Sequence, residues 1–416
     1  MRIHFFLALA AAMLSPTVGA LEREPAPVMH ADNFVKVDMA LRSGHYEKLL
    51  AIDKHAVGTG LLRDLVKDRI APGIHLTALD QENSCRQQYR ASLSSDDLYR
   101  QCLYVSIGNY FLWGRYADAR QLASLFYGPS LKRRRLNDLP ANIAALLQTV
   151  PSASGLNPAK RDDLRLTLDG QYAETEITAH NGVPTIIAML DIKGKSIAAK
   201  FVIDTAASNS ALSYQTLHQI SGIAPEGEVF DETAAQILNV SVNDVRFINV
   251  LFQPIKADLN ILGLDVLRQL DGIKLSSRKL QIWVGYSPHS CNAPLINSSS
   301  PVGDWSRIAV PAKINNVDTD IVIDTGASFD AKLHGMDMHK IPLRLRRSIT
   351  YLTADGARTA EAILGHVNIQ ISGQNFPSKY IGVGGDRYIM PWSLGYSWLS
   401  QKDLYLNIKD SCYSLN

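Results

Sequence analysis

An octapeptide that occurs twice decides the fold, as Phe201-Val202-Ile203-Asp204-Thr205-Ala206-Ala207-Ser208 and again as Ile321-Val322-Ile323-Asp324-Thr325-Gly326-Ala327-Ser328. In each copy three apolar residues, most of them β-branched, run directly into Asp-Thr and then into small residues. A short apolar run of this kind favours a buried strand, and the small residues favour a tight loop after it. Each copy therefore predicts a strand that ends by presenting an aspartate.

The sequence around the two octapeptides repeats as well, in the same order. Each octapeptide is preceded by a strand-like approach, followed at a distance by an apolar–Gly element, and closed by a final strand-like run. In the first copy these are Lys195–Ala199, Ile261–Leu267 (containing Leu262 and Gly263) and Leu280–Val284; in the second they are Val317–Asp320, Ser393–Leu399 (containing Leu394 and Gly395) and Leu404–Ile408. The matching context predicts an internal duplication that builds two β-rich lobes.

This arrangement suits a particular chemistry. A glycine after the Asp-Thr allows close backbone approach, so that main-chain N–H groups can reach the carboxylate. Two such units related by a pseudo-twofold axis would place two carboxyl groups face to face, where both cannot ionise and one proton is shared. The ionised member can take a proton from a water held between them, while the protonated member donates to a substrate carbonyl. Neither a metal nor a cofactor is needed.

At these residues the chain resembles a known family. Residues 184–412 are similar to two retropepsin-type aspartic protease units fused in one chain, as in the bilobal pepsin-like enzymes. The stretch Asp324–Ser328 matches the retroviral-type signature, and Leu262-Gly263 and Leu394-Gly395 match the family's later apolar–Gly element. The resemblance implies a catalytic dyad of Asp204 and Asp324, supported by the rest of both loops and by the two apolar–Gly elements.

The same resemblance implies how such a protein would meet its substrate. It implies a peptide or protein substrate bound in an extended conformation, flap hairpins over the cleft, and a sheet to which the ends of both lobes contribute. Asp355-Gly356 is a strong hairpin signal in the second unit, where a flap is expected, and Tyr351 would line the cleft. An ordinary exposed hairpin is the alternative. In the first unit residues 226–240 should hold the counterpart, but no clear turn dipeptide marks it.

The first octapeptide departs from the family pattern, because Ala206 stands where the family has glycine. If φ is positive at Ala206 the loop must distort, at a cost on the order of 1 kcal/mol or more, and if φ is ordinary the alanine costs little. Ala207 and Ala327 replace the hydroxyl residues found in many pepsin-like enzymes. Without hydroxyl donors to stabilise a carboxylate, the dyad should titrate higher, so we expect activity at mildly acidic to neutral pH.

The first twenty residues are typical of a secretory signal peptide, with Arg2, the apolar run Phe5–Leu14 and the small residues Val18–Ala20. An anchor that is never cleaved is the alternative, but the run is too short for the ~20 apolar residues that span a bilayer. We therefore expect a periplasmic or secreted protein without a stable membrane anchor.

Export implies an oxidising compartment, in which cysteines form disulfides. Four cysteines allow three pairings, and four free thiols are the alternative. We favour Cys85–Cys102, which are close in a helical stretch, and Cys291–Cys412, which lie near the ends of the two similar segments. The sheet shared by both lobes, which the resemblance implies, would suit the second pair.

The region before the lobes is expected to be helical, because its apolar residues recur at helical spacing. The fragments Arg42–Glu47 and Leu112–Ala117 share a Gly-x-Tyr core, and the second, with Gly108 and Ala119 around it, resembles a tetratricopeptide helix pair. An unrelated helical bundle is the alternative. The predicted fold is thus multidomain, a helical domain followed by a two-lobed β-rich acid-protease fold, with these parts: 1–20 signal peptide, 21–150 helical domain, 151–183 linker and first strand region, 184–290 first lobe, 291–416 second lobe.

Composition excludes several other classes of protein. The 42 Lys and Arg residues against 40 Asp and Glu give a net charge of +2, without the basic footprint of a nucleic-acid partner. The 11 histidines lack metal-ligand spacing, and Ser208 and Ser328 lack the Gly-x-Ser-x-Gly setting of a serine hydrolase. Two hypotheses remain: an exported aspartic endopeptidase, or a catalytically inactive relative that binds peptides or proteins. In either, the helical domain offers a site for a protein partner.

Overall fold

The computed structural model describes residues 32–45, 64–66, 69, 76–89, 95–131, 139–148, 165–180, 183–192, 194–222, 232–291, 293–353, 356–384 and 389–415. They form two compact units. The β-rich unit contains Gln148–Asn297 and Ser306–Asn416, and the helical unit contains the described residues from Asp32 to Leu147 together with Ser298–Trp305. The predicted signal segment 1–20 and the linker residues 151–164 lie outside the described residues. Among the described helices, none combines the length and hydrophobicity needed to cross a membrane.

The helical unit is built around one central helix. Its described helices are α1 (Asp32–Ser43), α4 (Ala78–Tyr89), α5 (Ser95–Leu112), α6 (Tyr116–Leu131) and α7 (Ala141–Gln148). Residues 105–112 of α5 are all buried, so this helix packs on every side rather than along one stripe. The Cys85–Cys102 disulfide joins α4 to α5 with a Cα–Cα distance of 5.8 Å, which is the pairing favoured from the sequence.

The repeated Gly-x-Tyr fragment marks two helix ends. Gly44 follows α1 with φ 70° and Gly114 follows α5 with φ 68°. In this left-handed conformation the Gly44 N–H donates to the Ala40 carbonyl and the Gly114 N–H to the Phe111 carbonyl, which satisfies carbonyls left open by the ending helix. The similarity between the two fragments follows from this shared role in ending a helix. The tetratricopeptide resemblance itself stays a prediction.

The first lobe is an eight-stranded sheet in the order β1-β8-β6-β9-β5-β4-β3, with β7 pairing β4 and β8. Two short helices, α8 (Tyr214–Ser221) and α9 (Leu264–Leu267), follow strands of this sheet. The strands are β1 (Thr167–Asp169), β3 (Thr178–His180), β4 (Val183–Ile192), β5 (Lys195–Ile203), β6 (Ala211–Ser213), β7 (Gln236–Val242), β8 (Val245–Ile255) and β9 (Asn260–Leu262).

The second lobe is another eight-stranded sheet, in the order β13-β14-β15-β20-β16-β19-β18-β17. Its helical elements are α10 (Tyr396–Leu399) and the 3₁₀ turns Met338–Lys340 and Leu343–Leu345. The strands are β13 (Ile296–Ser299), β14 (Ser306–Ile314), β15 (Val317–Asp324), β16 (Ala331–Met336), β17 (Arg347–Thr353), β18 (Gly356–Ile371), β19 (Gln374–Gly384) and β20 (Trp392–Gly395).

The two lobes repeat one pattern of strand pairing. In the first lobe β5 runs parallel to β9, and β9 is antiparallel to β6. In the second lobe β15 runs parallel to β20, and β20 is antiparallel to β16. A short helix follows the last strand in both, α9 after β9 and α10 after β20. The internal duplication expected from the sequence is therefore present in the topology as well.

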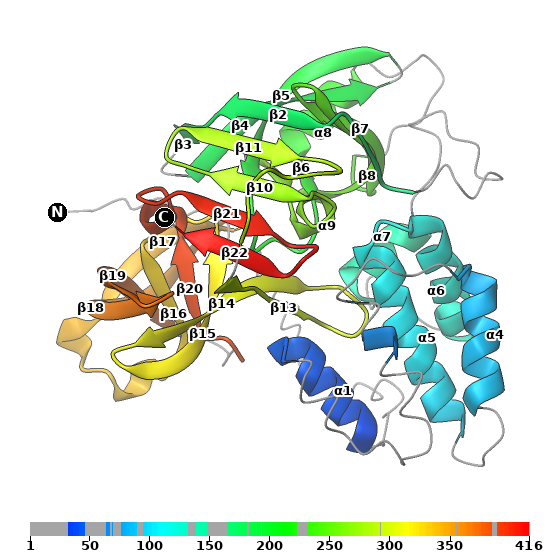
Figure 1. The fold of residues 1–416 in the computed structure, drawn as a ribbon, viewed down its shortest axis with the longest axis horizontal. Helices are drawn as coiled ribbons and strands as arrows, with labels where there is room; N and C mark the ends of the chain where they lie inside the picture. The colour runs from blue at the N-terminus through cyan, green and yellow to red at the C-terminus, as the bar shows by residue number, and fades with distance from the viewer. Residues whose placement is uncertain are drawn as a thin grey trace. The chain divides into compact units, whose positions relative to one another are not determined.

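A six-stranded sheet joins the ends of the two lobes, in the order β12-β22-β21-β10-β11-β2 (Figure 1). At its centre β10 of the first lobe pairs with β21 of the second, with Ile273 opposite Leu406. The strands are β2 (Tyr172–Glu176), β10 (Gly272–Leu275), β11 (Lys279–Trp283), β12 (Ala293–Pro294), β21 (Leu404–Asn407) and β22 (Cys412–Leu415).

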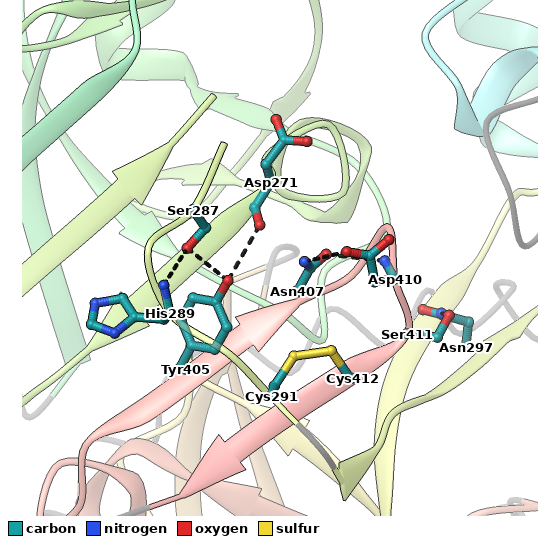
Figure 2. The surroundings of a disulfide bond; sticks show 10 residues. All are labelled: Asp271, Ser287, His289, Cys291, Asn297, Tyr405, Asn407, Asp410, Ser411 and Cys412. Atoms are coloured by element: carbon teal, nitrogen blue, oxygen red, sulfur yellow. Dashed lines mark hydrogen bonds between the residues drawn. A yellow bond between two sulfur atoms is a disulfide. The ribbon is translucent and has the colours of Figure 1, made fainter. Parts of the chain in front are cut away.

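The Cys291–Cys412 disulfide closes one end of this joining sheet, with a Cα–Cα distance of 5.6 Å (Figure 2). Close to it, the Tyr405 hydroxyl donates to Ser287 Oγ at 2.8 Å and to the Asp271 carbonyl at 3.4 Å. The bridge ties the chain that leaves the first lobe to the last strand of the second. It is the second pairing favoured from the sequence.

Candidate active site

Two buried strands deliver the two aspartates. β5 ends at Ile203, directly before Asp204, and β15 ends at Asp324 itself. The parallel neighbour lies in the same register in both lobes, since Ile203 pairs with Leu262 and Ile323 with Leu394. Both aspartates are buried, with exposed fractions of 0% for Asp204 and 2% for Asp324. A carboxyl group is thus held at the end of a rigid, apolar strand in each copy.

The apolar–Gly elements lie where the active-site loops cross them, and only glycine fits there. A Cβ on Gly263 would lie 2.6 Å from the Asn209 carbonyl carbon and 2.9 Å from the Ala207 oxygen. A Cβ on Gly395 would lie 2.2 Å from the Phe329 oxygen. Real Cβ atoms essentially never approach other atoms this closely. The two glycines therefore support the loops through close packing of backbone on backbone.

The threonines of the two loops lock the lobes together. The Thr205 hydroxyl donates to the Ile323 carbonyl and the Thr325 hydroxyl donates to the Ile203 carbonyl, both at 2.6 Å. In return the Thr205 N–H donates to Thr325 Oγ1 at 3.1 Å, and the Thr325 N–H donates to Thr205 Oγ1 at 3.2 Å. These four bonds exchange donor and acceptor between the copies, as a local twofold axis requires. They fix each aspartate relative to the other.

The Asp204 carboxyl group touches the opposite loop. Its Oδ1 accepts hydrogen bonds from the N–H groups of Ala206 at 2.9 Å and Ala207 at 3.0 Å. A Cβ built on Gly326 would lie 2.5 Å from Asp204 Oδ2 and 2.4 Å from its carboxyl carbon. Two further oxygens, Asp204 Oδ2 and Asp324 Oδ1, are buried and accept no hydrogen bond from the described residues. Each acid thus keeps one oxygen for a proton, a water or a substrate.

Burial raises the pKa of both acids. It raises the pKa of Asp204 to about 7, while the N–H groups of Ala206 and Ala207 oppose the shift. The pKa of Asp324 is raised well above its ordinary value, first by burial and then by the negative charge of Asp204. The cations Lys332 and Arg307 oppose that shift. Near neutral pH the pair therefore holds on to a proton, which is the state that acid–base catalysis by two carboxyl groups needs.

Ala206 fits its loop without left-handed strain. It is described in the structure and is not among the residues with positive φ. Its methyl group packs in a small apolar cluster with Ile296, Ala309, Val322 and Met390. The distortion that a positive φ would have required does not occur, because the backbone dihedral at this position is open to any L-residue.

The expected flap is a hairpin at the edge of the second lobe. β17 and β18 are antiparallel, with Thr353 opposite Gly356 and Tyr351 opposite Arg358. Asp355 and the side chain of Tyr351 lie outside the described residues, so the cleft-lining role stays a prediction. In the first lobe, residues 226–231 of the expected counterpart also lie outside the described residues, and its last residues belong to β7.

Sequence reasoning missed a buried cation beside the second aspartate. Lys332, on β16, is only 6% exposed, and its Nζ lies 5.9 Å from the centroid of the Phe329 ring. Burial lowers the pKa of Lys332 to about 8, while the charge of Asp324 acts to raise it. A lysine inside an otherwise ordinary strand was the signal, but only the fold shows that it acts on Asp324. Near it, burial followed by the charges of Lys332 and Arg307 lowers the pKa of His334 to about 2, which keeps that ring neutral.

A third buried acid lies behind the first active-site loop. Asp265 on α9 is 1% exposed and accepts a hydrogen bond from the Ser210 hydroxyl at 2.8 Å. Burial raises its pKa to about 6, and the bond from Ser210 opposes the shift. Asp265 contacts the support of the loop and not the dyad. Within the described part of the chain, no group of three or more His, Cys, Asp or Glu residues could hold a metal ion.

Comparison with known proteins adds little to this geometry. No protein-family model matches the chain, and no curated protein matches its sequence. Among solved structures, the aspartic proteinase from Irpex lacteus aligns with a TM-score of 0.39 and 11% identity, over 59% of this chain and 96% of that protein. The assignment of the site therefore depends on this chain's own residues.

Proposed function

We propose that the β-rich unit is an aspartic endopeptidase with Asp204 and Asp324 as its catalytic dyad. The observation that carries this proposal is the reciprocal threonine exchange, which holds two buried carboxyl groups against each other at the ends of matching strands. Buried acids are costly to a fold unless they have a role. Two such acids, with raised pKa values and one oxygen each that accepts no hydrogen bond from the described residues, fit a pair that shares a proton.

The two acids differ in their surroundings, and this assigns their parts in the reaction. Asp204 accepts two backbone N–H bonds, which stabilise its charged form, so Asp204 is the base. Burial and then the negative charge of Asp204 raise the pKa of Asp324, so we assign the proton to Asp324. A water between them attacks the peptide carbonyl carbon and gives a proton to Asp204, while Asp324 gives its proton to the carbonyl oxygen. Asp204 then protonates the leaving nitrogen, the C–N bond breaks, and the diol returns a proton to Asp324.

The test is cleavage of a denatured protein by the purified chain across pH, with and without pepstatin. We expect pepstatin-sensitive cleavage, and we expect Asp204→Asn and Asp324→Asn each to lower kcat on the order of 100- to 10,000-fold, as for loss of a general acid or base. Asp318→Asn is the matched control, because Asp318 lies on β15 with its side chain 85% exposed. Cleavage that survives both dyad substitutions would overturn the proposal.

The pH profile tests the raised pKa values. Because Asp204 must be ionised and Asp324 protonated, the rate rises as pH approaches the pKa of about 7 at Asp204 and falls again when the shared proton is lost. We expect a bell-shaped profile of kcat/KM with its acidic limb near pH 7 and its maximum above that limb. An optimum below about pH 3, in the range of pepsin's dyad, would contradict this assignment.

The same site leaves a second hypothesis, a peptide-binding protein without activity. That hypothesis was based on the alanine at position 206, and the absence of a positive φ at Ala206 argues against a strained loop. Tight binding of an extended peptide with no turnover at any pH would favour it. The substrate class, the export of the chain and a partner for the helical unit are part of the proposal, and the two disulfides support export.

A further inference from the structure

One segment of the chain belongs to the helical unit although it lies between two strands of the second lobe. We call Ser298–Trp305 the strap. It follows β13 and leads into β14, yet it forms one compact unit with the helices. Its first residues and Val302 are buried, with exposed fractions of 2% for Ser298, 3% for Ser299, 2% for Ser300 and 0% for Val302. The strap is therefore part of the core of the helical unit.

Arg69 holds the strap at its centre. This residue is 3% exposed, and its Nη1 donates to Ser299 Oγ at 2.9 Å and to the Ser300 carbonyl at 2.8 Å. Its Nη2 donates to the Pro301 carbonyl at 2.6 Å and to the Val105 carbonyl of α5 at 3.1 Å. One guanidinium thus connects three consecutive strap residues to the central helix. Buried charge-assisted bonds of this kind are expensive to lose, because the remaining partners stay desolvated.

Two glycines, one on α5 and one on the strap, allow the two backbones to approach each other closely. A Cβ on Gly108 of α5 would lie 2.3 Å from the Pro301 oxygen. Gly303 has φ +74°, and a Cβ there would lie 3.2 Å from the Cα of Gly108. On α7, the Asn142 side chain donates to the Val302 carbonyl at 3.0 Å. α5, α7 and Arg69 together form a complementary binding surface for the strap.

The residue that follows the strap is bonded to the first active-site loop. The Ser306 N–H donates to Ser208 Oγ at 2.7 Å, and the Ser208 hydroxyl donates to the Ser306 carbonyl at 3.2 Å. Ser208 ends the octapeptide that presents Asp204. Ser306 also begins β14, whose residues Ala309–Ile314 pair with β15, the strand of Asp324. The strap is therefore continuous in sequence with β14, which is hydrogen-bonded to the first aspartate-bearing loop and paired with the second aspartate-bearing strand.

We propose that the helical unit is a permanent part of the working protein, and that it positions the dyad by gripping the strap through Arg69. A helical unit that is removed as a propeptide would be incompatible with this grip, since removal would expose the buried strap. Arg69 is a positioning residue and touches no reacting atom. The effect on catalysis rests on the proposed function, but the permanence of the unit does not.

The test is to cut the chain between the units. A site for a specific protease is inserted into the predicted linker, residues 151–164, and the cut protein is passed over a sizing column without denaturant. No disulfide crosses the cut, since Cys85–Cys102 lies before it and Cys291–Cys412 after it. We expect the helical fragment to co-elute with the β-rich fragment, which carries the strap. Separation of two folded fragments at micromolar concentration would overturn the proposal.

Substitutions at Arg69 and Gly108 then identify the residues that hold the strap. Arg69→Ala should weaken association of the cut fragments on the order of 10- to 100-fold, by loss of several charge-assisted bonds. Gly108→Ala should weaken it too, because its Cβ meets the Pro301 oxygen. Arg86→Ala is the matched control, because Arg86 interacts with Glu82 and Tyr99 and its side chain is 44% exposed. Far-UV circular dichroism of the isolated helical fragment separates unfolding from weaker association, and equal affinity in all four proteins would refute the grip.

A catalytic readout tests positioning. In the uncut chain, Arg69→Ala should lower kcat while KM stays within about twofold, because the strap leads to the loops that present the aspartates. Arg69→Lys, which keeps the charge but fewer donors, should recover part of kcat. A wild-type chain without proteolysis would remove the proposed function, and the co-elution result would still decide whether the helical unit is permanent. Unchanged kcat in Arg69→Ala would refute the positioning role.

Discussion

The two copies of the repeat share their backbone and differ in what surrounds each acid. Threonine bonds, parallel neighbour strands and crowded glycines are the same in both lobes. The differences lie at Ala206 against Gly326, and at Leu212 against Lys332, which occupy matching positions after the aspartate. The repeat thus supplies the frame of a symmetric pair, and single substitutions give its two acids different surroundings. Asymmetry of this kind is what a pair with divided roles needs.

The alanine and the glycine are not interchangeable between the lobes. Ala206 has an ordinary φ and packs its methyl group against apolar side chains. Gly326 also has no positive φ, so its backbone does not demand glycine. Glycine is required at position 326 by steric crowding, because a Cβ there would lie 2.4 to 2.8 Å from atoms of the Asp204 carboxyl group. The approach of the two loops is therefore closer on one side of the pair than on the other.

Gly326→Ala makes the second loop like the first and should have the largest effect. The Asp204 carboxyl group must move away from the new methyl group, and a misplacement near 1 Å costs catalysis about 100-fold. We expect kcat to fall by about that factor, with a smaller change in KM. Steady-state kinetics on a peptide substrate measures this. Gly373→Ala is the control, because a Cβ added to that glycine would meet nothing within 4 Å, although its φ of +80° adds local strain.

The outcome that would break this comparison is a Gly326→Ala enzyme with full activity. It would mean that the close contact between Gly326 and Asp204 is relieved at no cost, and that the two loops are equivalent after all. A crystal structure of the variant with a displaced Asp204 carboxyl group would instead sharpen the comparison.

The sequence was sufficient for the frame of the site. The octapeptides and the apolar–Gly elements are local patterns, and the crowding at Gly263 and Gly395 explains why these residues recur in both copies. The hairpin signal was sound as well, although Gly356 begins β18 and pairs with Thr353 instead of occupying the turn. In each case the requirement comes from the backbone within a few residues.

What the sequence did not reveal depends on contacts between distant residues. Lys332 has no motif around it, and its importance comes only from burial beside Asp324. The strap contains three consecutive serines and belongs by position to the second lobe, but its partner Arg69 lies 230 residues earlier than Ser299. No periodicity or spacing rule connects residues so far apart. Such contacts follow from the assembled core and not from local propensity.

Lys332→Leu makes the second lobe like the first at another position and should have an intermediate effect. The positive charge of Lys332 lowers the pKa of Asp324, so its loss raises that pKa further. The pH profile of kcat/KM should therefore move to higher pH, on the order of one unit for loss of a nearby opposite charge. The alkaline limb, which reports loss of the Asp324 proton, should carry this shift, while the acidic limb, which reports Asp204, should stay in place.

Lys313→Leu is the control for this change, because it removes an exposed lysine of the same lobe that pairs with Asp318 in the solvent. The charged groups that act on Lys332 are Asp324 and Arg307, and both stay in place in either variant. If Lys332→Leu shows the pH profile of the wild type, the lysine does not set the pKa of the dyad, and the asymmetry must come from the amide donors to Asp204.

Ala206→Gly restores the family's glycine in the first lobe and should have the smallest effect. The alanine is unstrained, so its removal relieves nothing, and we expect kcat/KM to stay within about threefold. The methyl group leaves an apolar cluster and the loop gains freedom in the unfolded state, so the free energy of unfolding should fall by about 0.5–1 kcal/mol. Kinetics and denaturant unfolding of the same preparation measure both. A tenfold gain in rate would show that the methyl group restrains the dyad, and the difference between the two loops would then be a brake on catalysis instead of a neutral substitution.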